Sequence, residues 1–99
     1  MFEKIGSLNV NFTAYTANSN GKEISLSHKE FEILNYLWKK RNAVVSRDDL
    51  LNEVWGYEES PTTRTVDNFI LKLRQKIEKD SNNPKIILTV HGVGYKLIS

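Results

Sequence analysis

Apolar and polar positions repeat with a helical period over residues 64–79. The apolar positions follow one another at steps of three and four and form one stripe, made of Val66, Phe69, Ile70, Leu73 and Ile77. The opposite face of this predicted helix carries Arg64, Asn68, Lys72, Gln75 and Lys79. A helix with one buried face and one face of long hydrogen-bond donors has the composition needed to enter a DNA major groove. On periodicity alone, an ordinary amphipathic surface helix fits the same pattern.

Two further helical patterns precede this one. Ser27 begins a capping box, and apolar side chains at helical spacing follow it, so we predict a helix over about 28–40. Ser46 repeats the capping signal before a second helix, over about 47–55, whose inner face is Leu50, Leu51, Val54 and Trp55. A short helix, a connection and a second helix with a polar outer face make a helix-turn-helix pattern.

The remaining segments read as strands. Residues 2–24 alternate loosely and predict three or four short antiparallel strands, at about 3–5, 8–12, 13–17 and 22–25, with a hairpin turn at Asn20-Gly21. Val44-Val45 can form a short bridge to a sheet, and residues 86–98 predict a two-stranded hairpin, or wing, around Gly92-Val93-Gly94. We therefore expect one domain over residues 1–99 of α+β class, a winged helix-turn-helix with three helices, an N-terminal antiparallel sheet and a C-terminal β-hairpin.

Composition excludes several function classes. The 99 residues suffice for one core, and the sequence has no cysteine, which excludes disulfides and Cys-ligated zinc. The two histidines, His28 and His91, lie in separate predicted elements, so we predict no metal site, no cofactor and no enzyme. No apolar run has the length that spans a membrane, and we expect no membrane partner.

The distribution of charge along the chain indicates the kind of partner. Residues 1–63 carry a net −2 and residues 64–99 a net +4, which together make the overall +2. Basic charge gathered in the last third of a small domain favours a polyanionic partner.

Three motifs at these spacings resemble a known family. They are Val54-Trp55-Gly56, Arg64-Thr65-Val66-Asp67 and the segment Thr-Val-His-Gly-Val-Gly-Tyr-Lys at 89–96. Together they resemble the winged-helix DNA-binding effector domain of two-component response regulators, the OmpR/PhoB class, over nearly the whole chain. The resemblance implies a bacterial, cytoplasmic transcription regulator of a phosphorelay that binds tandem half-sites of double-stranded DNA. It also implies a fused receiver domain, which is not in this chain; an excised domain and a standalone protein both remain open.

The resemblance, with the helical wheel, assigns site residues. Base contacts are expected from Asn68, Lys72 and Gln75, because Asn pairs with adenine N6 and N7 and Lys donates to guanine O6 and N7. Contacts to the DNA backbone are implied for Trp55, Arg64, Thr65, Phe69, Arg74, Lys76, Thr89 and Tyr95, and wing contacts for His91 and Gly92. The sequence departs from the family pattern where Phe69 replaces a polar contact, Leu71 a basic residue and His91 the wing arginine.

Alternatives stay open at three places. Arg74 lies on the same side of the helix as Asp67, so a structural ion pair between them competes with a phosphate contact. The acidic loop with Tyr57, Glu58, Glu59 and Ser60 is either a contact to RNA polymerase or a solvated linker, and its carboxylates could pair with Arg64. Exposed Leu71 beside Phe69 favours a rival function, a winged-helix module that binds a receiver domain or a polymerase subunit.

Overall fold

The N-terminal third of the chain is a four-stranded antiparallel sheet. The computed structural model describes residues 2–56 and 61–99. The strands pair in the order of the chain and are β1 (Glu3–Ile5), β2 (Leu8–Asn11), β3 (Thr16–Ser19) and β4 (Lys22–Glu23). Asn20 and Gly21 both have positive φ, 53° and 80°, which is the backbone of a two-residue hairpin turn and confirms the turn predicted there.

The predicted bounds of the third strand are wrong. We predicted 13–17, but β3 begins at Thr16, which pairs with Asn11. The side chain of Asn11 accepts hydrogen bonds from the amides of Thr13 and Ala14, both at 3.0 Å, and Tyr15 has a positive φ of 56°. These local bonds hold residues 12–15 in a turn and delay the strand.

The helices begin at the predicted caps. The capping box at Ser27 is present, with the Ser27 amide donating to Glu30 Oε1 at 2.7 Å, and α1 is His28–Lys39. After Ser46, α2 (Arg47–Leu50) continues as one π-helical stretch, η1 (Leu51–Trp55), so the single helix predicted over 47–55 contains two hydrogen-bonding patterns.

Helix α3 (Thr63–Ile77) ends two residues before the predicted position. Glu78 leaves the helical conformation with ψ of 144°, and its carboxylate accepts hydrogen bonds from the amides of Lys85, Ile86 and Ile87 at 2.8–3.1 Å. A buried carboxylate that binds three amides stabilises the chain reversal after α3 and stops the helix there.

The C-terminal hairpin forms with a third strand. β6 (Ile87–Val90) and β7 (Gly94–Leu97) pair antiparallel, and β5 (Val45–Ser46) pairs with the other edge of β7. A Cβ at Gly94 would collide with the carbonyl oxygen of Val45, so this close pairing requires glycine. The predicted bridge near Val44-Val45 is thus part of a three-stranded sheet.

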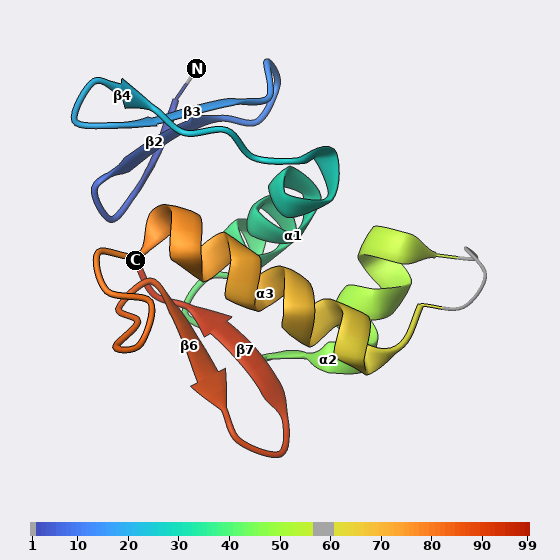
Figure 1. Cartoon of the computed structure of the whole chain (residues 1–99). Coiled ribbons are helices and arrows are strands. Elements are labelled where there is room, and N and C mark those ends of the chain that lie inside the picture. The colour runs from blue at the N-terminus through green and yellow to red at the C-terminus, as the bar shows by residue number, and fades with distance from the viewer. Residues whose placement is uncertain (1, 57–60) are drawn as a thin grey trace.

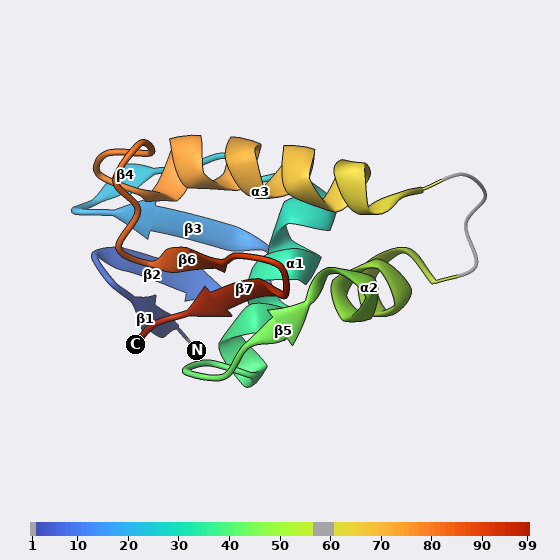
Figure 2. The ribbon, with the colours of Figure 1, turned by 90° about the horizontal axis from the view of Figure 1, so that it is seen from below.

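In Figure 1, helix α3 runs across the front of the molecule, with the N-terminal sheet above it and the wing below it, and Figure 2 shows it along one side of the molecule. Val66, Ile70 and Leu73 are fully buried against the core, as the stripe predicted. The predicted winged helix-turn-helix architecture is confirmed. Within residues 2–56 and 61–99, no helix combines the length and apolarity needed to cross a membrane.

Candidate nucleic-acid interface

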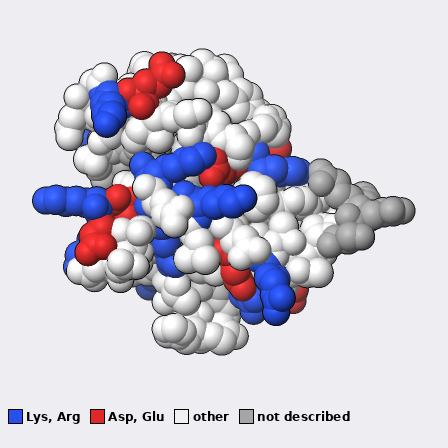
Figure 3. Space-filling model, viewed as in Figure 1, with Lys and Arg blue, Asp and Glu red and all other residues white. Residues whose placement is uncertain are grey.

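The predicted base-contacting residues lie on the outer face of α3 and are exposed to solvent. Asn68, Lys72 and Gln75 are exposed, and so is Arg64 in the first turn of the helix. Figure 3, in the orientation of Figure 1, shows Lys and Arg side chains spread over the central band where α3 lies. This face is therefore accessible to a large partner, although contact between these residues and DNA stays a prediction.

An aromatic pair supports one border of this face. The rings of Phe69 and Trp55 meet edge to face, with centroids 5.3 Å apart, and Trp55 is only 7% exposed. The ammonium group of Lys72 lies 5.3 Å from the centroid of Phe69, and that of Lys29 lies 5.5 Å from Trp55. The aromatic pair thus holds η1 against α3 and places a lysine at each end.

Lys29 is a residue that the sequence analysis missed. It donates from Nζ to the carbonyl oxygen of Val54 at 3.0 Å and lines a hollow of about 430 Å³ with Phe69, Lys72 and Lys76. In the sequence, Lys29 looks like an ordinary surface residue of α1, since nothing in its neighbourhood points to α3. Only the packing of α1 beside α3 brings this cation to the border of the interface.

Lys76 is bound to a buried carboxylate. Its Nζ lies 2.7 Å from Oε1 of Glu30, whose side chain is only 2% exposed and also caps α1. Burial would raise the pKa of Glu30, but the hydrogen bonds from Lys76 and Ser27 and the charge of Lys76 outweigh it and lower this pKa below its usual value. The charge of Lys76 is therefore partly compensated inside the protein.

Three elements meet at Asp67. Its carboxylate accepts from Arg47 Nε at 3.1 Å and Nη2 at 2.5 Å, and from the hydroxyl of Tyr95 at 2.6 Å. Burial raises the pKa of Asp67, but the hydrogen bonds from Tyr95 and Arg47 and the charge of Arg47 outweigh it, so this pKa lies below its usual value. Burial and the nearby Asp67 raise the pKa of Tyr95 to about 12. This network joins the start of α2, the first turns of α3 and strand β7.

The ion pair considered between Arg74 and Asp67 is therefore wrong. Arg74 is 7% exposed and turns to the wing, where its guanidinium donates to the carbonyl oxygen of Ile87 at 2.8 and 3.0 Å and to Thr89 Oγ1 at 2.8 Å. The guanidinium carbon also lies 5.5 Å from the ring centroid of Tyr95. Arg74 holds β6 on α3, and its predicted phosphate contact would compete with these bonds.

The remaining predicted residues lie around this face. Thr65 accepts a hydrogen bond from the amide of Thr62 at 3.3 Å at the start of α3. Tyr95, in strand β7 of the wing, is buried, and its hydroxyl donates to Asp67. His91 and Gly92 are exposed at the hairpin turn. The predicted polymerase loop at Tyr57, Glu58, Glu59 and Ser60 lies outside the described residues, as does the ion pair considered for Arg64.

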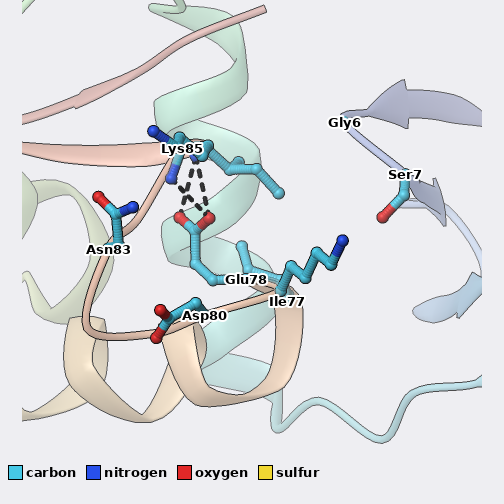
Figure 4. Close-up of a pocket in the computed structure, with 9 residues that line it drawn as sticks. Gly6, Ser7, Ile77, Glu78, Asp80, Asn83 and Lys85 are labelled. Atoms are coloured by element: carbon cyan, nitrogen blue, oxygen red, sulfur yellow. Dashed lines mark hydrogen bonds between the residues drawn. The ribbon is translucent and has the colours of Figure 1, made fainter.

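A second hollow lies at the opposite end of α3. It has a volume of about 480 Å³ and is lined by residues of the β1–β2 turn and of the loop after α3, among them Gly6, Ser7, Ile77 and Lys85. Figure 4 shows the Glu78 carboxylate turned to the backbone at Lys85 rather than into this space. Across the described residues, no group of three or more acidic or histidine side chains could hold a metal ion.

The fold and the exposed donor face define a winged helix-turn-helix of the kind that presents one helix to nucleic acid. The sequence model of the family described as "Transcriptional regulatory protein, C terminal" matches residues 21–97, and the chain belongs to this family. The family consists of DNA-binding output domains of transcription regulators and not of enzymes.

Individual relatives agree with this membership. The DNA-binding response regulator MtrA of Mycolicibacterium smegmatis is 44% identical over 92 residues, which are 93% of this chain and 40% of that protein. The response regulator DrrB of Thermotoga maritima, an OmpR/PhoB homologue, is 39% identical with a TM-score of 0.90 over 99% of this chain and 44% of that one. The chain thus spans about two fifths of the length of these relatives.

A third relative has nearly the same extent as this chain. The DNA-binding domain of RstA from Klebsiella pneumoniae, solved in complex with the RstA box, is 28% identical with a TM-score of 0.85. The alignment covers 98% of this chain and 96% of that domain.

Proposed function

We propose that this domain binds double-stranded DNA in a sequence-specific manner and is the output domain of a two-component response regulator of transcription. The observation that carries the proposal is the exposed row Arg64, Asn68, Lys72 and Gln75 on a helix whose other face is buried in the core. Such a row can enter the major groove while the body of the domain stays outside it.

In this proposal, α3 reads bases and its surroundings bind the backbone. Asn68, Lys72 and Gln75 supply donors that match purine acceptors in the major groove. Arg64 lies in the first turn of α3, where unpaired amides and the helix dipole also favour a phosphate. His91 and Gly92 at the wing turn would meet the adjacent backbone or minor groove, while Thr65, Phe69, Lys76 and Thr89 would border the contact.

The longer relatives suggest the kind of protein in which this domain works. The names of MtrA and DrrB describe response regulators, and this chain spans 40–44% of their length, so we propose that the domain works joined to a receiver domain. Binding as two copies on tandem half-sites, a cytoplasmic location and contact with RNA polymerase through the loop at 57–60 complete the proposal.

Two substitutions on α3 distinguish a residue that contacts bases from one that contacts phosphates. Lys72→Ala should weaken binding to the selected site by roughly 1–3 kcal/mol and relax one base position, since it removes a base contact. Arg64→Ala should weaken all sequences alike and flatten the slope of log K against log salt by about one unit. The measurements are selection from a random duplex pool and titrations at several salt concentrations; equal losses on selected and scrambled DNA would remove Lys72 from base reading.

A protein-binding module is the second candidate, because Leu71 on α3 is 56% exposed. Titration with random duplex DNA at low salt separates the two functions. Failure of the domain to bind DNA at micromolar concentration would overturn DNA binding and favour a protein partner.

A further inference from the structure

One large apolar side chain lies within the polar face of α3. Leu71 is 56% exposed, whereas Ile70 and Leu73 beside it in sequence are fully buried. It lies three residues after Asn68 and four before Gln75, so these three side chains project from the same side of the helix. Leu71 is thus next to two of the residues proposed to read bases.

The packing of the domain does not account for this leucine. Among the described residues, Leu71 belongs neither to the buried core nor to the half-buried apolar side chains packed against it, such as Phe69. Leaving it exposed forgoes the stabilisation that burial of an apolar side chain gives.

The surface around Leu71 supports a protein-docking patch, the basis of the second candidate function, less well than it supports a single apolar contact. Such a patch needs contiguous apolar surface, and the helical neighbours of Leu71 on this face are polar, namely Asn68, Lys72 and Gln75. The other large apolar side chains exposed in the described part of the chain lie on other elements and are Phe2, Tyr15, Val44 and Val93. Leu71 is an isolated apolar group in a row of donors.

The major groove offers an isolated apolar group of matching chemistry. Among the base edges there, thymine alone presents a methyl group, on C5, beside its O4 acceptor. We propose that Leu71 contacts the 5-methyl group of a thymine and thereby selects thymine at one position of the DNA site. This inference rests on the proposed function, and it adds a base that the donors Asn68, Lys72 and Gln75 do not specify.

The test replaces thymine by deoxyuridine, which lacks only the methyl group. In the duplex selected by residues 1–99, each thymine is changed in turn, and the dissociation constant is measured for the wild type, Leu71→Met and Leu71→Asn. At one position the wild type should lose about fourfold in affinity, the value of one buried methyl group. Leu71→Met, which keeps an apolar side chain of similar volume, should show the same loss, and Leu71→Asn should bind both duplexes equally.

The outcomes separate this inference from the proposed function. Lys72→Ala serves as the matched control, because it should weaken binding while the thymine-to-deoxyuridine ratio stays near four. If the domain binds a selected site but no thymine is sensitive, or if Leu71→Asn keeps the loss, then Leu71 does not read a methyl group although DNA binding stands. If no duplex is selected at all, both the inference and the proposed function are overturned.

Discussion

At the scale of single residues, Asp67 connects three parts of the interface. Arg47 and Tyr95 both donate to its carboxylate, and they come from the start of α2 and from β7. Because Asp67 lies one residue before Asn68, its bonds orient the turn of α3 from which base reading is proposed. The Asp67 carboxylate and its two donors thus align α2, α3 and β7, in addition to the bonds from Arg74 to β6.

Replacing Tyr95 by phenylalanine should lower the free energy of unfolding at pH 7 by about 1–3 kcal/mol, because Asp67 loses a hydrogen bond. The pKa of Tyr95 in the fold is about 12, above its ordinary value of 10, so the fold favours the protonated phenol. The contribution of Tyr95 is therefore complete below pH 10 and is lost as the pH rises towards 12. Urea denaturation of wild type and Tyr95→Phe at pH 7, 10 and 11.5 measures this change.

The expected signature is convergence of the two proteins at high pH. Tyr15→Phe, on the exposed β2–β3 turn, is the control for a general effect of losing a phenol. A constant difference between wild type and Tyr95→Phe from pH 7 to 11.5 would contradict the role given to the Tyr95 hydroxyl.

At the scale of elements, α1 and α3 are joined by the pair Glu30 and Lys76. Glu30 also closes the capping box at Ser27, so one buried carboxylate serves both the start of α1 and the packing of α3 against it. Without Lys76, burial would leave this carboxylate with the Ser27 hydrogen bonds alone. Breaking such a pair costs more than an exposed ion pair would suggest.

Lys76→Met should lower the free energy of unfolding by roughly 1–3 kcal/mol at neutral pH. Because the pKa of Glu30 is lowered in the fold, the stabilisation by Lys76 is complete above the ordinary glutamate pKa of 4.5 and is lost as the pH falls through the lower pKa of the folded state. Urea denaturation should therefore show a large difference in the free energy of unfolding between wild type and Lys76→Met at pH 7 and a smaller difference at pH 3. Lys79→Met, an exposed lysine just beyond α3, is the matched control and should change stability little at either pH.

At the scale of the whole molecule, several basic side chains near the interface already bind partners within the domain. Arg74 donates to Ile87 and Thr89, Arg47 to Asp67, and Lys76 to Glu30. Arg64, Lys72 and Lys79 remain exposed on the outer side of α3 and the residues after it. One copy of the domain should accordingly neutralise few phosphates and bind a single half-site weakly.

The salt dependence of DNA binding should reflect the small number of exposed basic side chains. Each neutralised phosphate adds about −0.9 to the slope of log K against log salt, so one copy on one half-site should give a slope of roughly −3. Two copies on a tandem site should give about twice that value. Titrations by fluorescence anisotropy between 50 and 200 mM salt measure both slopes, and a single-copy slope of about −5 would mean that Arg47, Arg74 and Lys76 leave their partners to bind DNA.

The sequence by itself determined the helical elements and the face that α3 exposes. The cap at Ser27, the apolar stripe through Val66, Ile70 and Leu73, and the hairpin turn at Asn20-Gly21 are encoded within a few residues of where they act, and the fold class follows from their order. The start of β3 also depends on local sequence, because the side chain of Asn11 binds the amides of the turn before it. The alternation of apolar residues does not reveal such a bond, so the predicted start was wrong.

Only the tertiary structure decided which charges are available. Asp67 and Arg74 lie on one side of the same helix, yet they bind different partners, because Arg47 and the backbone of Ile87 reach them from elements distant in sequence. Lys29 approaches the interface for the same reason. Hydrogen bonds and ion pairs act over a few ångströms in space, so the sequence indicates which groups can donate or accept, and packing alone selects their partners.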